Sequence, residues 1–170
     1  MLAPIVHPLD ALFDWLPDCD FGVMDHGFAP HGRDYTFLVE SSMGKDPGRH
    51  QVQFTHVAEL SYVTAVADDA WAKSWGEAFV DYQSWLDAGE PDGYVWGTCW
   101  SLAWPGIRAI ESSAKASAWA ARLGSPMCEA EIETDRFRMN LIFSSLRWAK
   151  VGNETFTVSS VVIPLPSQGS

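Results

Sequence analysis

Polar and apolar residues alternate along much of this chain, most clearly over residues 50–66 (HQVQFTHVAELSYVTAV). Most even positions from Val52 to Val66 are apolar, whereas the odd positions are largely polar. Successive side chains of a strand point to opposite faces, so the pattern predicts a strand with one buried and one solvated face. It also places His56 in the middle of the buried face.

The same alternation predicts several further strands. Residues 34–40 (DYTFLVE) are expected to pair with the long strand as a hairpin across the turn-rich segment SSMGKDPGR. Residues 127–134 and 137–143 are expected to be joined tightly at Asp135-Arg136. Shorter strands are expected over residues 21–28, 94–100 and 155–163.

Three segments have helical features instead. Residues 9–15 fit a short turn of helix, and the large apolar residues of segment 68–88 recur at every third or fourth position. Residues 112–123 are rich in alanine and are followed by Gly124, a typical residue for ending a helix.

This order of elements favours hairpins over crossovers. It predicts an α+β fold, either a mostly antiparallel β-sandwich or a curved sheet, with one or two packed helices. A chain of 170 residues without an internal repeat is expected to form a single domain over residues 1–170. Residues 1–20 are interpreted as an N-terminal arm that docks on this domain, and residues 164–170 as a mobile tail.

The chain is acidic, with a formal net charge of -11. A negative surface repels a phosphate backbone, so direct binding to nucleic acid is disfavoured and a basic protein is the favoured partner. The alternative is that the acidity only keeps a chain with 9 tryptophans in solution.

Targeting features are missing from the sequence. No window approaches the roughly 18 unbroken apolar residues of a membrane span. The N-terminus lacks the pattern of a signal peptide, and an odd number of cysteines without a C-x-x-C pair argues against a disulfide framework. We therefore expect a cytoplasmic protein with reduced thiols and without a membrane partner.

Glutamates line the solvated face of the predicted strand 127–134, namely Glu129, Glu131 and Glu133, and Glu59 is expected on a neighbouring strand. They form either an ordinary solvated face or a docking surface for a basic partner. Trp104 is the last tryptophan of the tryptophan-rich segment 94–106 and is the tryptophan most expected to be exposed. If it is not simply core, this segment suits a protein hot spot, or alternatively a carbohydrate or small-molecule site.

Three histidines, His26, His31 and His56, are candidate ligands of a metal or of a small molecule, which leaves a metal-dependent hydrolase as a further alternative. The sequence contains neither H-E-x-x-H nor H-x-H, and no nucleophile elbow, so its spacing does not favour a dedicated metal or catalytic site. For His56 the favoured interpretation is a buried histidine that is bonded to a carbonyl or carboxylate. No cofactor is predicted.

The segments MDHGFAPHGRDYTFLVE, HQVQFTHVAELSYVTAV and FRMNLIFSSLRWAKV resemble small actinobacterial-type proteins. Their arrangement is also similar to the β-rich immunity proteins of bacterial toxin systems. This resemblance covers about half of the chain and implies a cytosolic binding role without a cofactor. Together with the charge, it predicts a non-enzymatic acidic binding protein of the immunity or antitoxin type, which neutralises a cationic partner.

Overall fold

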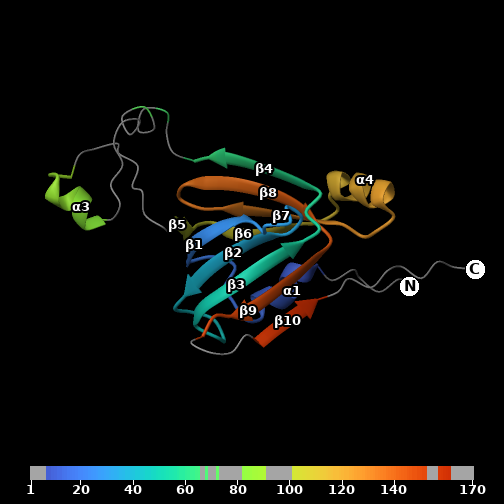
Figure 1. Ribbon diagram of the computed structural model, residues 1–170, viewed down its shortest axis with the longest axis horizontal. Coiled ribbons are helices and arrows are strands. Elements are labelled where there is room, and N and C mark those ends of the chain that lie inside the picture. Colours follow the sequence, from blue (N-terminus) through green and yellow to red (C-terminus); the bar gives the residue numbers. More distant parts are fainter. Residues whose placement is uncertain are drawn as a thin grey trace, which may run out of the picture.

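The computed structural model describes residues 7–65, 82–90, 101–152 and 157–161, together with positions 68 and 72. These residues form two antiparallel sheets with three short helices (Figure 1), which confirms the predicted mostly antiparallel α+β fold. Sheet A has the strand order β10-β9-β3-β2-β1-β5, and sheet B has the order β4-β8-β7-β6.

The strands of sheet A are β1 (Phe21–Phe28), β2 (Tyr35–Ser41), β3 (Gly48–Thr55), β5 (Ser101–Ala103), β9 (Ser145–Lys150) and β10 (Thr157–Val161). The strands of sheet B are β4 (Glu59–Thr64), β6 (Gly106–Ile110), β7 (Cys128–Glu133) and β8 (Phe137–Phe143). The helices are α1 (Pro8–Phe13), α3 (Tyr82–Asp87) and α4 (Ala114–Leu123). None of these helices is long and apolar enough to cross a membrane.

Both predicted hairpins are present. β2 pairs with β3 from Tyr35 opposite Phe54 to Ser41 opposite Gly48. β7 pairs with β8 across the turn at Asp135, where the Thr134 N–H donates to the Phe137 carbonyl over 2.8 Å. The predicted helix near residues 112–123 is also confirmed, because Ser113 caps the start of α4 and Gly124, at φ 64°, ends it.

The long strand predicted over residues 50–66 is wrong, because the chain changes sheet in its middle. β3 ends at Thr55 in sheet A and β4 begins at Glu59 in sheet B. His56 lies at the crossover with a left-handed backbone (φ 50°) and an exposed side chain. The buried histidine of this segment is instead His50, which is 1% exposed.

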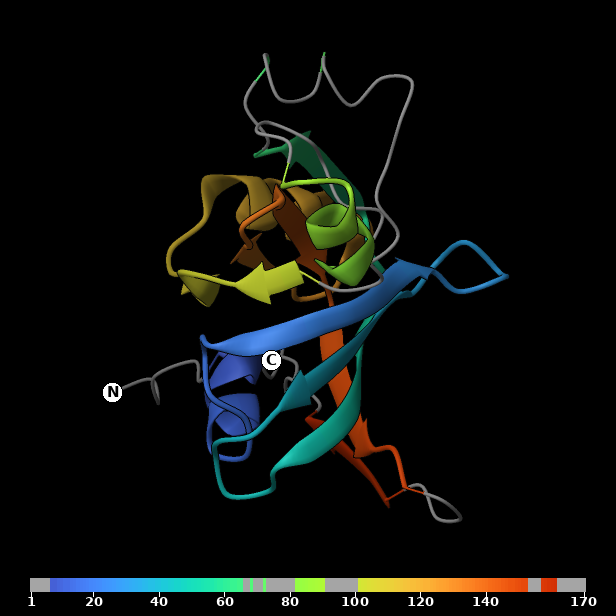
Figure 2. The same ribbon diagram turned by 90° about the vertical axis from the view of Figure 1, so that its left-hand side faces the viewer.

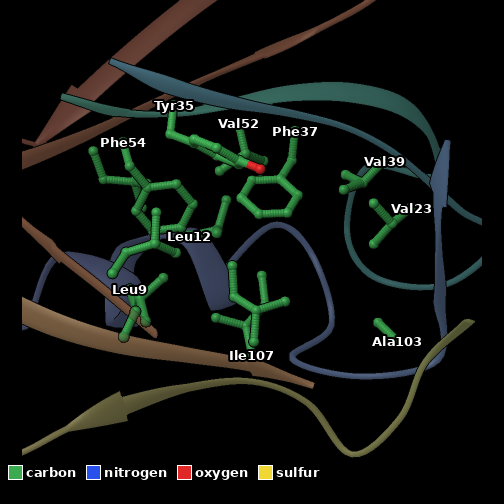
Figure 3. Close-up of a cluster of buried hydrophobic side chains, with 14 of the residues drawn as sticks. Leu9, Leu12, Val23, Tyr35, Phe37, Val39, Val52, Phe54, Ala103 and Ile107 are labelled. Atoms are coloured by element: carbon green, nitrogen blue, oxygen red, sulfur yellow. The ribbon is translucent and has the colours of Figure 1, made fainter. Parts of the chain in front are cut away.

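The core lies between the inner faces of the two sheets (Figure 3). Phe37 of β2 and Phe54 of β3 are buried from one side, and Ile107 of β6 from the other. Leu9 and Leu12 of α1 are 0% and 1% exposed. Much of the predicted N-terminal arm is therefore an integral part of the core.

Some predictions fall on residues outside the described ranges. These are the strand over residues 94–100, the tail 164–170 and most of the helix over residues 68–88, of which α3 covers the last turn and a half. For the predicted strand 155–163, the backbone of Thr157–Val161 is described and pairs with β9 as β10.

Candidate functional site

The four glutamates expected to form an acidic docking surface are engaged within the molecule. Glu131 is paired with Arg108 and Glu133 with Arg138, each over 2.5 Å. Arg108 lies directly across from Glu131 in the register of β6 and β7, and Arg138 directly across from Glu133 in β8. The outer face of sheet B is thus a mixed ladder of charges, because each of these two carboxylates is matched by a neighbouring guanidinium.

The remaining two glutamates of that set hold helix α4 on sheet B. Glu129 is 8% exposed and accepts a hydrogen bond from the Ser113 hydroxyl at the start of α4. Glu59 accepts hydrogen bonds from the Trp119 indole (2.9 Å) and from Lys115 (3.1 Å). The expectation that Glu129 faces solvent is therefore wrong, and both residues have a structural role.

Trp104, by contrast, is as exposed as expected, with 60% of its surface accessible. It follows β5 directly, at the turn where the chain crosses from the edge of sheet A to β6 of sheet B (Figure 2). Leu102 of β5 is also exposed, at 39%, whereas its neighbours Ser101 and Ala103 are buried. The alternation of β5 continues to the residue after it, so two large apolar side chains, Leu102 and Trp104, are presented to solvent.

Two aspartates are placed beside this turn by backbone contacts. The Asp20 N–H donates to the Ala103 carbonyl over 3.0 Å, and the Asp18 carbonyl accepts from the Ile107 N–H over 2.7 Å. Gly106 lets these segments approach, because a Cβ atom at that position would lie 2.0 Å from the Asp18 carbonyl oxygen. The backbones of Asp18 and Asp20, whose side chains are exposed, consequently lie beside the turn that carries Trp104.

A third exposed carboxylate approaches from the β7–β8 turn. Asp135 accepts the Leu102 N–H on its side chain and donates its own N–H to the Leu102 carbonyl, both over 2.9 Å. Among the residues that the structure describes, neither Asp18, Asp20 nor Asp135 forms an ion pair with a basic side chain. We call the set Leu102, Trp104, Asp18, Asp20 and Asp135 the Trp104 surface.

His26 belongs to an aromatic cluster between the sheets. Its Nδ1 lies 2.7 Å from the Tyr35 hydroxyl, and its ring lies 4.8 Å from that of Phe137 and 6.0 Å from that of Tyr62. Burial lowers the pKa of His26, and the nearby Asp25 offsets this only in part. Burial likewise raises the pKa of Tyr35 to about 12, with smaller contributions from Tyr62 and Asp25. Both side chains are thus neutral at physiological pH and act as packing groups.

His31 and His56 both lie near Asp34, and each makes its own local contacts. His31 Nε2 is 3.6 Å from the Asp34 carboxylate, whereas the His56 ring is bonded to the Ser144 hydroxyl over 2.9 Å. Within the described ranges, no three side chains of histidine, cysteine, aspartate or glutamate are grouped to hold a metal ion. His26, His31 and His56 are therefore not brought together as ligands in this part of the chain.

Sequence reasoning identified Trp104 but missed the aspartates beside it. From the sequence, the segment DWLPDCD (residues 14–20) is expected only to be part of an arm, although it places aspartates between apolar residues that anchor it. One feature of the sequence could have identified these aspartates. The apolar residue Leu16 anchors the segment in the core, whereas the carboxylates on either side of it are expected to face solvent.

The model of the YxiG-like protein family matches residues 4–160, which include all the strands of sheet B and nearly all of sheet A. No curated protein and no solved structure is significantly similar to the chain. Since the match spans most of the sequence, the chain belongs to the YxiG-like protein family.

Proposed function

We propose that this chain is a non-enzymatic acidic binding protein of the immunity or antitoxin type, which neutralises a basic partner protein in the cytoplasm. The observation that carries the proposal is the Trp104 surface. Trp104 is 60% exposed, and the exposure of a large apolar ring to water is energetically unfavourable. Tryptophan is also enriched among the residues that dominate protein interfaces. Its three neighbouring carboxylates fit a partner rich in lysine and arginine.

The net charge of the chain supports the same partner at longer range. A charge of -11 attracts a basic protein from a distance and speeds its encounter. The ion pairs on sheet B reduce the local charge of that face, whereas no ion pair within the described ranges includes the carboxylates of the Trp104 surface. Electrostatic steering would therefore direct a basic partner to the Trp104 surface rather than to the glutamates of β7.

Affinity capture with the whole tagged chain tests this proposal. The bait is exposed to a lysate of its source cells at low and at high salt, and in parallel as the variant Trp104→Ser. We expect one stoichiometric basic protein that is lost at high salt and lost with the variant, because screening weakens the ionic contacts and the variant removes the anchor. A partner retained in both conditions, or no partner at all, would contradict the proposal.

The same exposed indole favours one second candidate, a carbohydrate or small-molecule site in which Trp104 acts as a stacking platform. Ligand binding there would quench tryptophan fluorescence in the wild type and not in Trp104→Ser. Binding of this kind depends little on ionic strength, so the salt dependence of the interaction separates the two candidates.

A further inference from the structure

An open groove of about 450 Å³ lies over sheet A, and its lining includes Thr36, Leu38 and Gln51. These residues alternate with the buried residues of β2 and β3 and therefore face away from the core. Its lining comes from β1, β2 and β3, which lie side by side in the sheet, from Ala29 and Pro30 after β1, and from the residue that follows β9. The lining includes the side chains of Asp25, Thr36, Leu38, Gln51 and Val151 and the backbone of Gly27. A groove of this size can hold one long side chain together with part of its backbone.

A β-bulge in β1 turns a carboxylate towards this groove. Val23 is opposite Val39, but the next paired residue of β1 is Asp25, opposite Leu38, so the register shifts by one residue between them. After the shift, His26 lies in the aromatic cluster of the inner face, and Asp25 is exposed on the outer face. Without the bulge, Asp25 would share the inward side of β1 with Val23.

The groove offers acceptors that the fold itself does not use. Within the described part of the chain, Asp25 forms no ion pair. The Thr36 hydroxyl and the Gln51 amide line the same groove and add two uncharged acceptors. Leu38 and Val151 supply apolar walls. One negative group, two neutral acceptors and an apolar lining match the chemistry of a lysine side chain, whose ammonium has three donors on an aliphatic stem.

We propose that this groove binds a lysine side chain of the basic partner, with the ammonium at Asp25 and the stem along Leu38, which lies directly opposite Asp25 in the sheet. The inference rests on the proposed function and names a second contact for the same partner. The register of sheet A supports continuity with the Trp104 surface, because Leu102 is paired with Gly22 of β1, three residues before Asp25. A partner that covers Trp104 would thus extend along β1 to the groove.

Titration of the whole chain with a capped hexalysine peptide, followed by amide NMR shifts, tests the groove without knowledge of the partner. We expect shifts at the amides of Thr36, Leu38 and Gln51, and none with a hexalysine whose side-chain amines are acetylated. Asp25→Asn should weaken the affinity measured at these amides roughly tenfold, since it removes a charge-assisted hydrogen bond. Glu40→Gln is the matched control, because it removes the same charge from the same face at a residue that is already paired with Arg49.

Gly27→Val is a second, steric test that leaves the charge unchanged. A Cβ atom at Gly27 has no neighbour within 4 Å, so the new side chain would fill the groove without a clash. It should abolish the shifts at Thr36 and Gln51 while the protein stays folded. If hexalysine shifts only the Trp104 indole, the groove proposal is wrong and the proposed function stands. An affinity at these amides that Asp25→Asn leaves unchanged, shifts that survive acetylation, or no shifts at either place, would also overturn it.

Discussion

At the scale of single residues, Asp34 controls where the chain changes sheet. It is 3% exposed, and its carboxylate accepts the His56 N–H and the Gln53 amide, each over 3.0 Å. Burial alone would raise its pKa, but hydrogen bonds from His56 and Arg33 and the charges of Arg33 and His31 outweigh burial and lower the pKa. The ionised carboxylate thereby fixes His56 in the left-handed conformation that ends β3.

We predict that Asp34→Ala lowers the free energy of unfolding by about 3 kcal/mol, because it leaves the His56 N–H and the Gln53 amide without their buried acceptor. Chemical denaturation at neutral pH measures the change. His56→Gly serves as a control at the same crossover, since it keeps the N–H and relieves a positive φ, and it should cost little. Equal losses for the two variants would argue against this role of Asp34.

Two histidines make the stability of the fold sensitive to mild acid. Burial lowers the pKa of His26 and of His7 below the ordinary value of 6.5. The charge of Asp25 opposes this at His26, and the hydrogen bond to the Glu129 carbonyl and nearby acidic groups oppose it at His7. The unfolded chain therefore binds protons first as the pH falls. The free energy of unfolding should be highest above about pH 6.5, decrease as the pH falls through that value, and level off below the folded pKa.

Denaturant titrations from about pH 8 to about pH 5 measure this dependence. We expect His26→Phe to reduce the slope and to leave the contribution of His7, because phenylalanine keeps the ring packing against Phe137 and cannot take up a proton. An unchanged slope in this variant would show that His26 does not contribute. Asp34 does not confound the measurement, because its lowered pKa places its own loss of stability at more acidic pH.

The crossover also shows what the sequence could and could not predict about residues. Period-2 alternation correctly placed Val52 and Phe54 of β3 on a buried face, with 1% and 0% exposure. It could not show that β3 and β4 belong to different sheets, because both have the same period and only three residues separate them. The alternation therefore predicts a buried His56, although β3 ends at Thr55 and the His56 side chain is exposed.

At the scale of elements, the close approach of the segment before β1 to the start of β6 builds the Trp104 surface. Ile107 of β6 donates its N–H to the Asp18 carbonyl, and Gly106 makes room for that contact at φ 101°. The individual strands could be predicted from their apolar periodicity. Their contact could not, because it depends on backbone atoms and on a glycine whose conformation the sequence does not reveal.

We predict that Gly106→Ala lowers the free energy of unfolding by at least about 3 kcal/mol, because its Cβ would lie 2.0 Å from the Asp18 carbonyl oxygen on a backbone unfavourable for alanine. Gly124→Ala is the matched control. It also has a positive φ, of 64°, but its Cβ would meet nothing within 4 Å, so the cost should be only about 1 kcal/mol. Thermal and chemical denaturation compare the two, and equal costs would show that the contact at Asp18 is unimportant.

At the scale of the whole molecule, the distribution of charge differs from what the sequence suggested. Alternation correctly placed Glu131 and Glu133 on the side of β7 away from the core. Whether a carboxylate is neutralised depends on the residue opposite it in the next strand, and that register is a property of the sheet. Arg108 and Arg138 occupy these opposite positions, so Glu131 and Glu133 are paired. The carboxylates that form no ion pair within the described ranges include Asp18, Asp20 and Asp135 instead.

The comparison of two double variants of equal charge tests the central claim, that a basic partner binds at the Trp104 surface. Asp18→Asn with Asp20→Asn removes two charges beside Trp104, and Glu131→Gln with Glu133→Gln removes two from β7. The measurement is the affinity of each whole chain for the captured basic partner at low salt. We predict that the aspartate variant binds at least tenfold more weakly, as the loss of two charge contacts implies, while the glutamate variant stays within about twofold of wild type. Weaker binding by the glutamate variant alone would contradict the claim and move the interface to sheet B.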